Sequence, residues 1–336
     1  MNSVGVPAPE VLEKATSEFT KLSDDYCRKE GVSILSVFSE YVEKLDRLVN
    51  GEQIDPGLST GIPELDAALN GGLKPGKLYI IGARPSMGKS ALALNFAAHQ
   101  SINKHSVCFQ SLEMPKEELM LRLIGIWGRQ NTSLIAQHDE RALAEFFEKL
   151  TPVAINAQEA RLHVDDDPDL SLIDVIHKAR RMKRKHGLDV LYIDYLQLMT
   201  GREERRHEMI GAITRGLKKL AKNLQIPVVA LSQLSRKVQD RPDKRPQLSD
   251  LRESGDIEQD ADVVIMPYRE IMDREDTQYP DLCEVFIRKQ RDGALGEVDL
   301  LYEGQYTSFR AYAGPAASER ARRISEKPKR GSGFYD

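Results

Sequence analysis

From Leu78 onward the sequence alternates between short runs of strand-forming residues and longer helical segments. The first five runs are separated by stretches long enough for a crossover helix, the connection that parallel strands require. The remaining runs follow one another closely, which favours an antiparallel edge. The pattern predicts an α/β fold with a mostly parallel central sheet. The expected strands are Leu78–Ile81, Val107–Ser111, Leu162–Val164, Val190–Ile193, Val228–Leu231, Val263–Met266, Val285–Ile287 and Val298–Tyr302.

Composition excludes several classes of protein. Of the 336 residues, 40% are hydrophobic and 30% are charged, which excludes full disorder. No apolar stretch approaches the roughly 20 residues of a membrane span, and the N-terminus lacks a secretory signal, so we expect no membrane partner. The three cysteines are widely spaced without a CxxC pair, so a disulfide scaffold or a zinc site is not expected. This cysteine usage favours the reducing cytoplasm as the location. The net charge is −4, so nucleic acid must be bound, if at all, at local basic patches.

Two helical patterns precede the strand-rich region. The first covers residues 12–26, and Ser33 is placed to cap the second. The second carries a narrow apolar stripe that either docks on a partner or packs on the chain's own domain. The stripe consists of Phe38, Tyr41, Leu45 and Leu48.

We therefore expect three parts along the chain. Residues 1–52 form a helical N-terminal segment with a linker helix, and residues 53–315 form the α/β domain. Residues 316–336 form a flexible basic tail, for which a solvated end is favoured over a functional role.

Residues 82–90, GARPSMGKS, fit the phosphate-loop pattern G-x-x-x-x-G-K-[ST] in full. They follow the strand LYII and precede the helical run ALALNFAAH, the context that the motif requires. The glycines let backbone N–H groups approach a phosphate chain. Lys89 would neutralise the β- and γ-phosphates, and the Ser90 hydroxyl would ligate Mg²⁺. The nucleotide-binding residues expected from this loop are Ser86, Met87, Gly88, Lys89, Ser90 and Ala91.

Two carboxylates are candidates for the chemistry. Asp194 follows the apolar run Val190–Ile193 at the C-terminal tip of a buried strand, where a metal ligand is expected. Asp189 competes for that role but lies at the start of the strand, and an aspartate that only caps the next turn fits the same spacing. Glu113 lies just beyond another strand and could accept a proton from water, although spacing alone favours a surface glutamate.

The motifs ARPSMGKS, SLEMP, IDYLQLM, PVVALSQL, DKRP, SDLRESGDIEQDADVV and KQRDG occur in this order. In this combination the chain resembles the C-terminal ATPase domain of DnaB-type replicative helicases, of the RecA-like hexameric class. The resemblance runs from about Leu58 to Gly314, and LRESGDIEQDAD is its most specific part. It implies a RecA-like P-loop NTPase that hydrolyses ATP with Mg²⁺, forms a homo-hexameric ring and moves 5′ to 3′ on single-stranded DNA.

The resemblance also assigns roles by position. It implies that Glu113 is the catalytic carboxylate, that Arg122 packs against the nucleotide base, and that Gln233 senses the γ-phosphate. Lys289 and Arg291, in KQRDG, resemble the basic pair that reaches the neighbouring subunit's ATP site. Without the resemblance, KQR would be interpreted as a solvated charge run.

DNA contacts are implied after Gln233. Segment 235–247 holds two acidic residues and five basic ones, and the basic ones include Arg236 and Lys237. In the family this segment lines the ring's channel. Arg252, Glu253 and Gly255 match a phosphate-contacting stretch. Residues 201–208 are a weaker candidate. The basic run 178–187 is interpreted as a solvated helix face rather than a DNA contact, and DDDPD at 165–169 as strand-end and helix-start residues rather than a metal site.

The N-terminal region departs from the family pattern. DnaB-type proteins carry a collar domain that meets primase, whereas about fifty residues precede the ATPase domain here, which fits a shortened chain or a compact phage or prophage form. A primase and a helicase loader are expected partners. The alternatives to a helicase are a recombinase or repair ATPase that forms filaments on DNA, and a nucleotide-switched assembly factor. LRESGDIEQDAD argues against the first, and Glu113 with KQR against the second.

Overall fold

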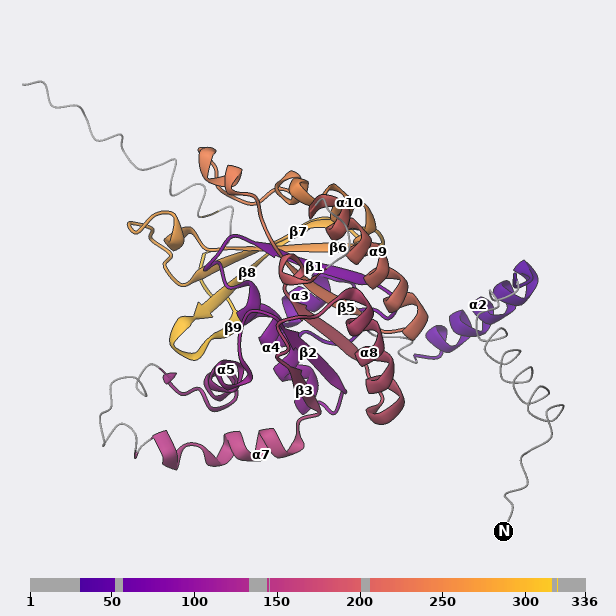
Figure 1. Cartoon of the computed structure of the whole chain (residues 1–336), viewed down its shortest axis with the longest axis horizontal. Helices are drawn as coiled ribbons and strands as arrows, with labels where there is room; N and C mark the ends of the chain where they lie inside the picture. Colours follow the sequence, from indigo (N-terminus) through magenta and orange to yellow (C-terminus); the bar gives the residue numbers. More distant parts are fainter. Residues whose placement is uncertain are drawn as a thin grey trace, which may run out of the picture. The chain divides into compact units, whose positions relative to one another are not determined.

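The computed structural model describes residues 31–51, 57–132, 144, 146–200, 206–315 and 319 (Figure 1). Leu48, Arg206 and residues 252–256 are described by their backbone alone. The predicted helix at 12–26, most of segment 201–208 and all but one residue of the predicted tail lie outside the described residues. The chain divides into two compact units, residues 1–55 and residues 56–336.

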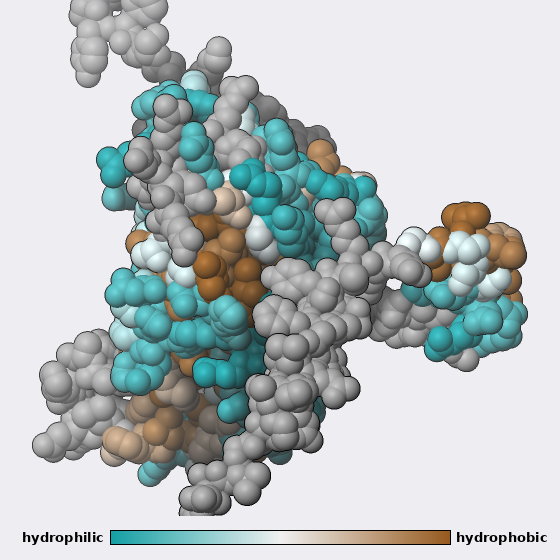
Figure 2. All heavy atoms as spheres, turned by 45° about the vertical axis from the view of Figure 1, so that its right-hand side comes forward, coloured by the Kyte–Doolittle hydropathy of each residue, from teal (hydrophilic) through white to brown (hydrophobic). Residues whose placement is uncertain are grey.

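In the first unit, helix α2 (Ile34–Val49) has one apolar side and one polar side. The predicted cap is confirmed, because the backbone N–H of Leu35 donates to Ser33 Oγ at 3.3 Å. Phe38, Tyr41 and Leu45 are 62%, 60% and 44% exposed. Figure 2 shows these two sides of the helix as brown and teal surfaces. A helix of this kind needs a covering surface to be stable in water.

A nine-stranded sheet forms the second unit, in the order β3-β2-β4-β5-β1-β6-β7-β8-β9. The pairs β3–β2, β2–β4, β4–β5, β5–β1 and β1–β6 are parallel. The pairs β6–β7, β7–β8 and β8–β9 are antiparallel. The strands are β1 (Leu78–Ala83), β2 (Val107–Ser111), β3 (Leu162–Asp165), β4 (Val190–Asp194), β5 (Val228–Gln233), β6 (Val263–Tyr268), β7 (Leu282–Gln290), β8 (Gly296–Glu303) and β9 (Ser308–Ala311).

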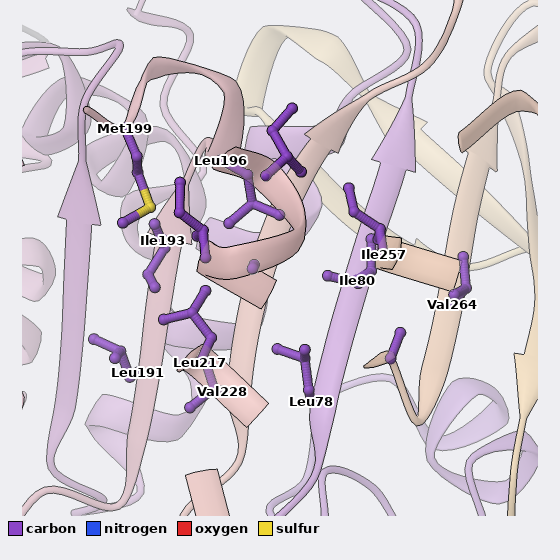
Figure 3. Close-up of a cluster of buried hydrophobic side chains, with 14 of the residues drawn as sticks. Leu78, Ile80, Leu191, Ile193, Leu196, Met199, Leu217, Val228, Ile257 and Val264 are labelled. Atoms are coloured by element: carbon purple, nitrogen blue, oxygen red, sulfur yellow. The ribbon is translucent and has the colours of Figure 1, made fainter. Parts of the chain in front are cut away.

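Helices cover both faces of this sheet, and each face has its own apolar core. Helices α8, α9 and α10 pack on the face to which Leu78, Ile80 and Val228 point (Figure 3). Helices α3, α4 and α5 pack on the other face, against Tyr79 and Ile81. None of the helices in the described ranges is long and apolar enough to cross a membrane. The helix bounds are α3 (Pro63–Ala68), α4 (Lys89–Ile102), α5 (Lys116–Gly128), α7 (Thr151–Glu159), α8 (Leu172–His186), α9 (Arg206–Leu224) and α10 (Gly255–Asp260).

The α/β prediction is confirmed, with one strand missed. All eight expected strands are present, and the parallel core with an antiparallel edge is as expected. The sequence did not indicate β9, which is short and half exposed. Its position matters because Asn95 of α4 joins the two elements. The Asn95 amide donates to the Thr307 carbonyl at 2.7 Å and accepts from the Phe309 N–H at 3.2 Å.

Candidate active site

The phosphate loop joins β1 to α4 and opens at the carboxyl edge of the sheet. Gly88 caps α4 in a left-handed conformation with φ of 95°, which only glycine adopts without strain. A Cβ atom there would also lie 3.1 Å from the Phe309 ring of β9. The positive φ therefore favours glycine strongly at this position, and the close Phe309 ring adds a weaker constraint. The first N–H groups of a helix have no partner within it, so the start of α4 has the geometry for the anion site that the motif predicts.

Lys89 and Asp194 meet directly below the loop. Lys89 Nζ lies 3.0 Å from Asp194 Oδ1 and 4.0 Å from the centre of the Tyr195 ring. The Asp194 side chain is fully buried and that of Lys89 is 12% exposed. Among the described residues, Asp194 Oδ2 is buried without a hydrogen-bond partner. A buried carboxylate oxygen without a donor is costly unless a ligand satisfies it.

The two candidate aspartates lie at opposite ends of β4. Asp194 is the last residue of the strand, whereas Asp189 precedes it and accepts from the Ser106 N–H at 2.8 Å. Asp189 is therefore occupied at the amino edge, away from the phosphate loop. The geometry agrees with the preference for Asp194.

Glu113 is held at the same edge by two local contacts. β2 and β4 are in register up to Ser111 and Asp194, and the next N–H, of Leu112, donates to the Asp194 carbonyl at 2.7 Å. Ser111 Oγ accepts from the Met114 N–H at 3.1 Å and donates to the Met114 carbonyl at 2.7 Å, which closes a tight turn around Glu113. The exposed Glu113 side chain lines an open space that it shares with Lys89 and Ser90.

That space is a cavity of about 580 Å³, large enough for a nucleotide. It gathers most of the residues predicted for the chain's own nucleotide site, whereas Asp194 is not part of the lining but pairs with Lys89, which is. Met87 is instead buried beside the loop, where its sulfur accepts from the Arg269 N–H at 3.4 Å, so only its backbone is available to a phosphate. The lining includes Ser86, Gly88, Lys89, Ser90, Ala91, Glu113, Arg122, Tyr195, Gln233 and Tyr302.

Arg122 lines the cavity from α5. Its guanidinium Nη2 donates to Glu118 Oε1 at 2.6 Å, one helical turn earlier, and the side chain is 30% exposed. The ion pair between Arg122 and Glu118 orients the planar group toward the open cavity, where it can stack on a planar base.

Gln233 ends β5 beside the phosphate loop, because β5 pairs with β1 as far as Ala83 and Gln233. The Gln233 backbone is held by Gln197, a residue for which the sequence predicted no role. Gln197 accepts from the Gln233 N–H at 3.2 Å and donates to the Gln233 carbonyl at 3.1 Å and to Ser232 Oγ at 2.9 Å. The signals for Gln197 in the sequence are its place in the motif IDYLQLM and its position three residues after Asp194.

Lys289 and Arg291 lie away from their own chain's phosphate loop. Lys289 is opposite Val264, which is opposite Ile80, so it lies four residue steps before the level of Arg84, about 13 Å along the strand direction at ~3.3 Å per step. Arg291 continues toward the amino end, where its N–H donates to the Asp262 carbonyl at 3.0 Å.

The carbonyls at the end of α10 hold both cationic groups. Lys289 Nζ donates to the Glu258 and Gln259 carbonyls, and Arg291 Nη2 donates to the Gln259 carbonyl. Arg291 Nε also lies 3.9 Å from Asp262 Oδ1. Partial burial and the neighbouring Arg291 lower the pKa of Lys289.

The predicted DNA-contacting segment begins where β5 ends. Arg236 and Lys237 lie on an exposed 3₁₀ turn, Arg236–Asp240. The other three basic residues of segment 235–247 are already paired within the fold, which reduces the free positive charge expected there. Arg241 forms a bidentate pair with Asp250 at 3.1 and 2.9 Å, Arg245 pairs with Glu284, and Lys244 pairs with Asp273.

Two further predictions can be placed. The backbone of Arg252 and Glu253 forms the 3₁₀ turn Leu248–Ser254, and Gly255 begins α10, while their side chains lie outside the described part. The basic run 178–187 lies in α8, which buries Val175 and Ala179 and leaves its basic side chains largely outward. Lys178 pairs with Asp165 and Asp167, so the acidic run 165–169 has a cationic partner within the fold.

The fold and this cavity define a class of protein, a P-loop ATPase with a mostly parallel sheet and the phosphate loop at its carboxyl edge. Comparison with known proteins identifies the family. Residues 57–311 match the model of the DnaB-like helicase C-terminal domain. The chain belongs to this family.

Known relatives and solved structures agree. The replicative DNA helicase DnaB of Rickettsia prowazekii is 39% identical, with 92% of this chain and 69% of that protein covered. The DnaB helicase of Geobacillus stearothermophilus is 37% identical, with 82% and 61% covered. A solved ATPase domain aligns over its full length and 84% of this chain, with 37% identity and a TM-score of 0.78. A DnaB-like replicative helicase, solved to study its interactions with primase, aligns over 72% of its length and 89% of this chain, with 35% identity and a TM-score of 0.75.

These similarities show a RecA-like, nucleotide-binding ATPase fold and the activity of an ATP-dependent replicative DNA helicase. They do not favour the recombinase or the assembly-factor interpretation.

Proposed function

We propose that this helicase works as a closed ring of six copies that moves 5′ to 3′ along single-stranded DNA. One observation carries the ring. The phosphate loop and the Lys289–Arg291 pair lie toward opposite edges of one sheet, so each copy offers half of a site at each edge. A neighbouring copy that presents its Arg291 to this cavity completes the site, and a repeated contact of this head-to-tail kind forms a ring when its rotation closes.

ATP hydrolysis follows from the placement of the side chains. Glu113 accepts a proton from a water, the water oxygen attacks the γ-phosphorus, and the bond to the bridging oxygen of ADP breaks. Lys89 and the N–H groups at the start of α4 hold the phosphates, and the Gln233 amide contacts the γ-phosphate. Arg122 packs against the base. Arg291 of the neighbour, supported by Lys289, stabilises the charge that develops on the transferred group.

Ser90 and Asp194 would hold Mg²⁺. The fit rests on the donor set, a hydroxyl and a carboxylate, and on the buried Asp194 oxygen without a partner among the described residues. When bound, Mg²⁺ would neutralise charge on the β- and γ-phosphates.

DNA would contact Arg236 and Lys237, which are exposed, and the stretch from Arg252 to Gly255. Exposed cations and backbone N–H groups there bind phosphates without reading the bases. The N-terminal segment to residue 52 and the domain 53–315 would act as linker and motor. The named relatives are bacterial replicative helicases, which supports a cytoplasmic location, and one solved relative interacts with primase, which supports a primase partner. A helicase loader is part of the proposal as a further partner.

A mixing experiment tests the shared site. Arg291→Ala and Glu113→Gln proteins should each bind ATP and fail to hydrolyse it. In mixed rings, some interfaces join an intact Glu113 to an intact Arg291, and these should regain hydrolysis. Mixtures that stay inactive despite demonstrated co-assembly would contradict action between copies, and full activity of Arg291→Ala alone would exclude it.

A further inference from the structure

Gln197 lies in the 3₁₀ turn Leu196–Leu198, directly after the strand that ends in Asp194. β4 and β5 are paired only as far as Ile193 and Ala230, while β5 continues to Gln233. The last part of β5 therefore lacks a strand partner on the β4 side among the described residues. The half-buried Gln197 side chain takes that place, since it bonds both the N–H and the carbonyl of Gln233.

Every backbone polar group of Gln233 and Leu234 forms a hydrogen bond with Gln197 or with the start of the phosphate loop. Gln197 bonds both groups of Gln233. The Leu234 N–H donates to the Ala83 carbonyl at 3.1 Å, and the Leu234 carbonyl accepts from Arg84 Nη1 at 3.1 Å. The dipeptide is therefore fixed between the phosphate loop and the turn after Asp194. The segment that follows it carries Arg236 and Lys237.

The chemistry of Gln197 is specific to an amide. Its oxygen faces an N–H, and its nitrogen faces a carbonyl and a hydroxyl, so only one orientation of the group satisfies all three bonds. A carboxylate of the same shape would place an acceptor against the Gln233 carbonyl, and an apolar side chain would leave both groups of Gln233 without this partner.

We propose that Gln197 is a positioning residue for ATP hydrolysis, which acts by fixing the backbone of Gln233 so that the Gln233 amide points at the γ-phosphate. The proposal rests on the function proposed above for Gln233. The Gln197 side chain thereby links β4, which ends in Asp194, to the segment that carries Arg236 and Lys237. A misplacement of about 1 Å at a catalytic group can cost on the order of 100-fold in rate, so a single amide can govern turnover.

A double-mutant cycle with Gln233→Ala tests this role. Gln197→Glu keeps the size of the side chain, and Gln197→Leu serves as an uncharged second variant. Each should lower kcat by roughly 10-fold with KM for ATP almost unchanged, because ground-state binding is unaffected. In a Gln233→Ala background the same changes should cost less than about 2-fold, because they act through a side chain that is no longer present. Gln158→Glu, on an exposed site of α7, is the matched control.

The outcomes separate the two proposals. If Gln233→Ala leaves kcat unchanged, the role proposed for Gln233 fails and the role of Gln197 fails with it. If Gln233→Ala lowers kcat but both Gln197 variants keep wild-type kcat, the positioning role alone is wrong. Equal losses from Gln197→Leu in the two backgrounds would also overturn it, since they would show an effect independent of Gln233.

Discussion

The two edges of the sheet treat their charged residues in different ways. At the carboxyl edge, Lys89 and Glu113 line a cavity, and the buried Asp194, which pairs with Lys89, has an oxygen without a partner among the described residues. Toward the amino edge, Lys289 and Arg291 are already bonded to the carbonyls of α10, and Arg291 is 48% exposed. The first arrangement buries the charges of Lys89 and Asp194 at the phosphate-loop cavity, whereas the second holds a cation at the surface. The proposal that Arg291 serves a neighbour's site rests on this difference.

Removal of Arg291 should have the largest effect. Arg291→Ala should lower kcat by about 10³–10⁵-fold, since an arginine opposite the transferred phosphoryl group contributes that much. ATP binding, followed with a slowly hydrolysed fluorescent analogue, should persist, whereas Lys89→Ala at the other edge should lose both binding and turnover. Arg274→Ala, at a 62% exposed side chain, is the control and should keep wild-type turnover. If Arg291→Ala hydrolyses ATP normally, the two edges do not share a reaction.

Glu113→Gln should rank next. The amide is nearly isosteric but cannot take a proton, so phosphate release should slow by about 10²–10⁴-fold while nucleotide binding remains. Glu117→Gln, in the exposed first turn of α5, is the matched control and should have no effect. Normal turnover in Glu113→Gln would return this residue to the surface glutamate that spacing alone favours.

DNA binding should change by a smaller amount. Arg236→Ala should weaken single-stranded DNA binding for every sequence and should reduce the slope of log K against log salt by about 0.7, the value for one phosphate contact. Arg252→Ala should behave in the same way. Arg184→Ala, an exposed cation of α8, tests whether any basic residue would do, and it should leave the slope unchanged. Identical slopes for Arg236→Ala and wild type would place segment 235–247 outside the DNA path.

The smallest expected effect is a pH shift at Lys289. Its pKa lies below the ordinary value of 10.5 because of burial and Arg291. A lysine is charged below its pKa, so this charge is lost at a lower pH than that of an exposed lysine. Turnover should therefore fall early on the alkaline side, and Lys289→Arg should move that fall to higher pH, because arginine stays charged. Superimposable pH profiles of kcat would show that the Lys289 charge does not serve the reaction.

The sequence predicted those features that depend on local pattern. The strand runs, the loop GARPSMGKS and the strand-end Asp194 are all properties of neighbouring residues, and the structure places them as expected. Gln197 was not predicted because its partners are backbone groups of β5, which lies beside β4 through the strand order of the sheet. The pairing of basic residues in segment 235–247 was not predicted for the same reason, because Glu284, the partner of Arg245, lies on a strand distant in sequence.

The contact between β9 and the phosphate loop has a consequence for synthesis of the chain. Phe309 packs against Gly88, and its N–H bonds Asn95, 214 residues earlier. A ribosome that adds about 5–20 residues per second needs roughly 10–40 s to cover that distance. During this interval the first strand, its loop and α4 exist without the residues that close over them. The phosphate loop and α4 therefore acquire their contacts with Phe309 only after β9 has been made, when the other strands of the sheet already exist.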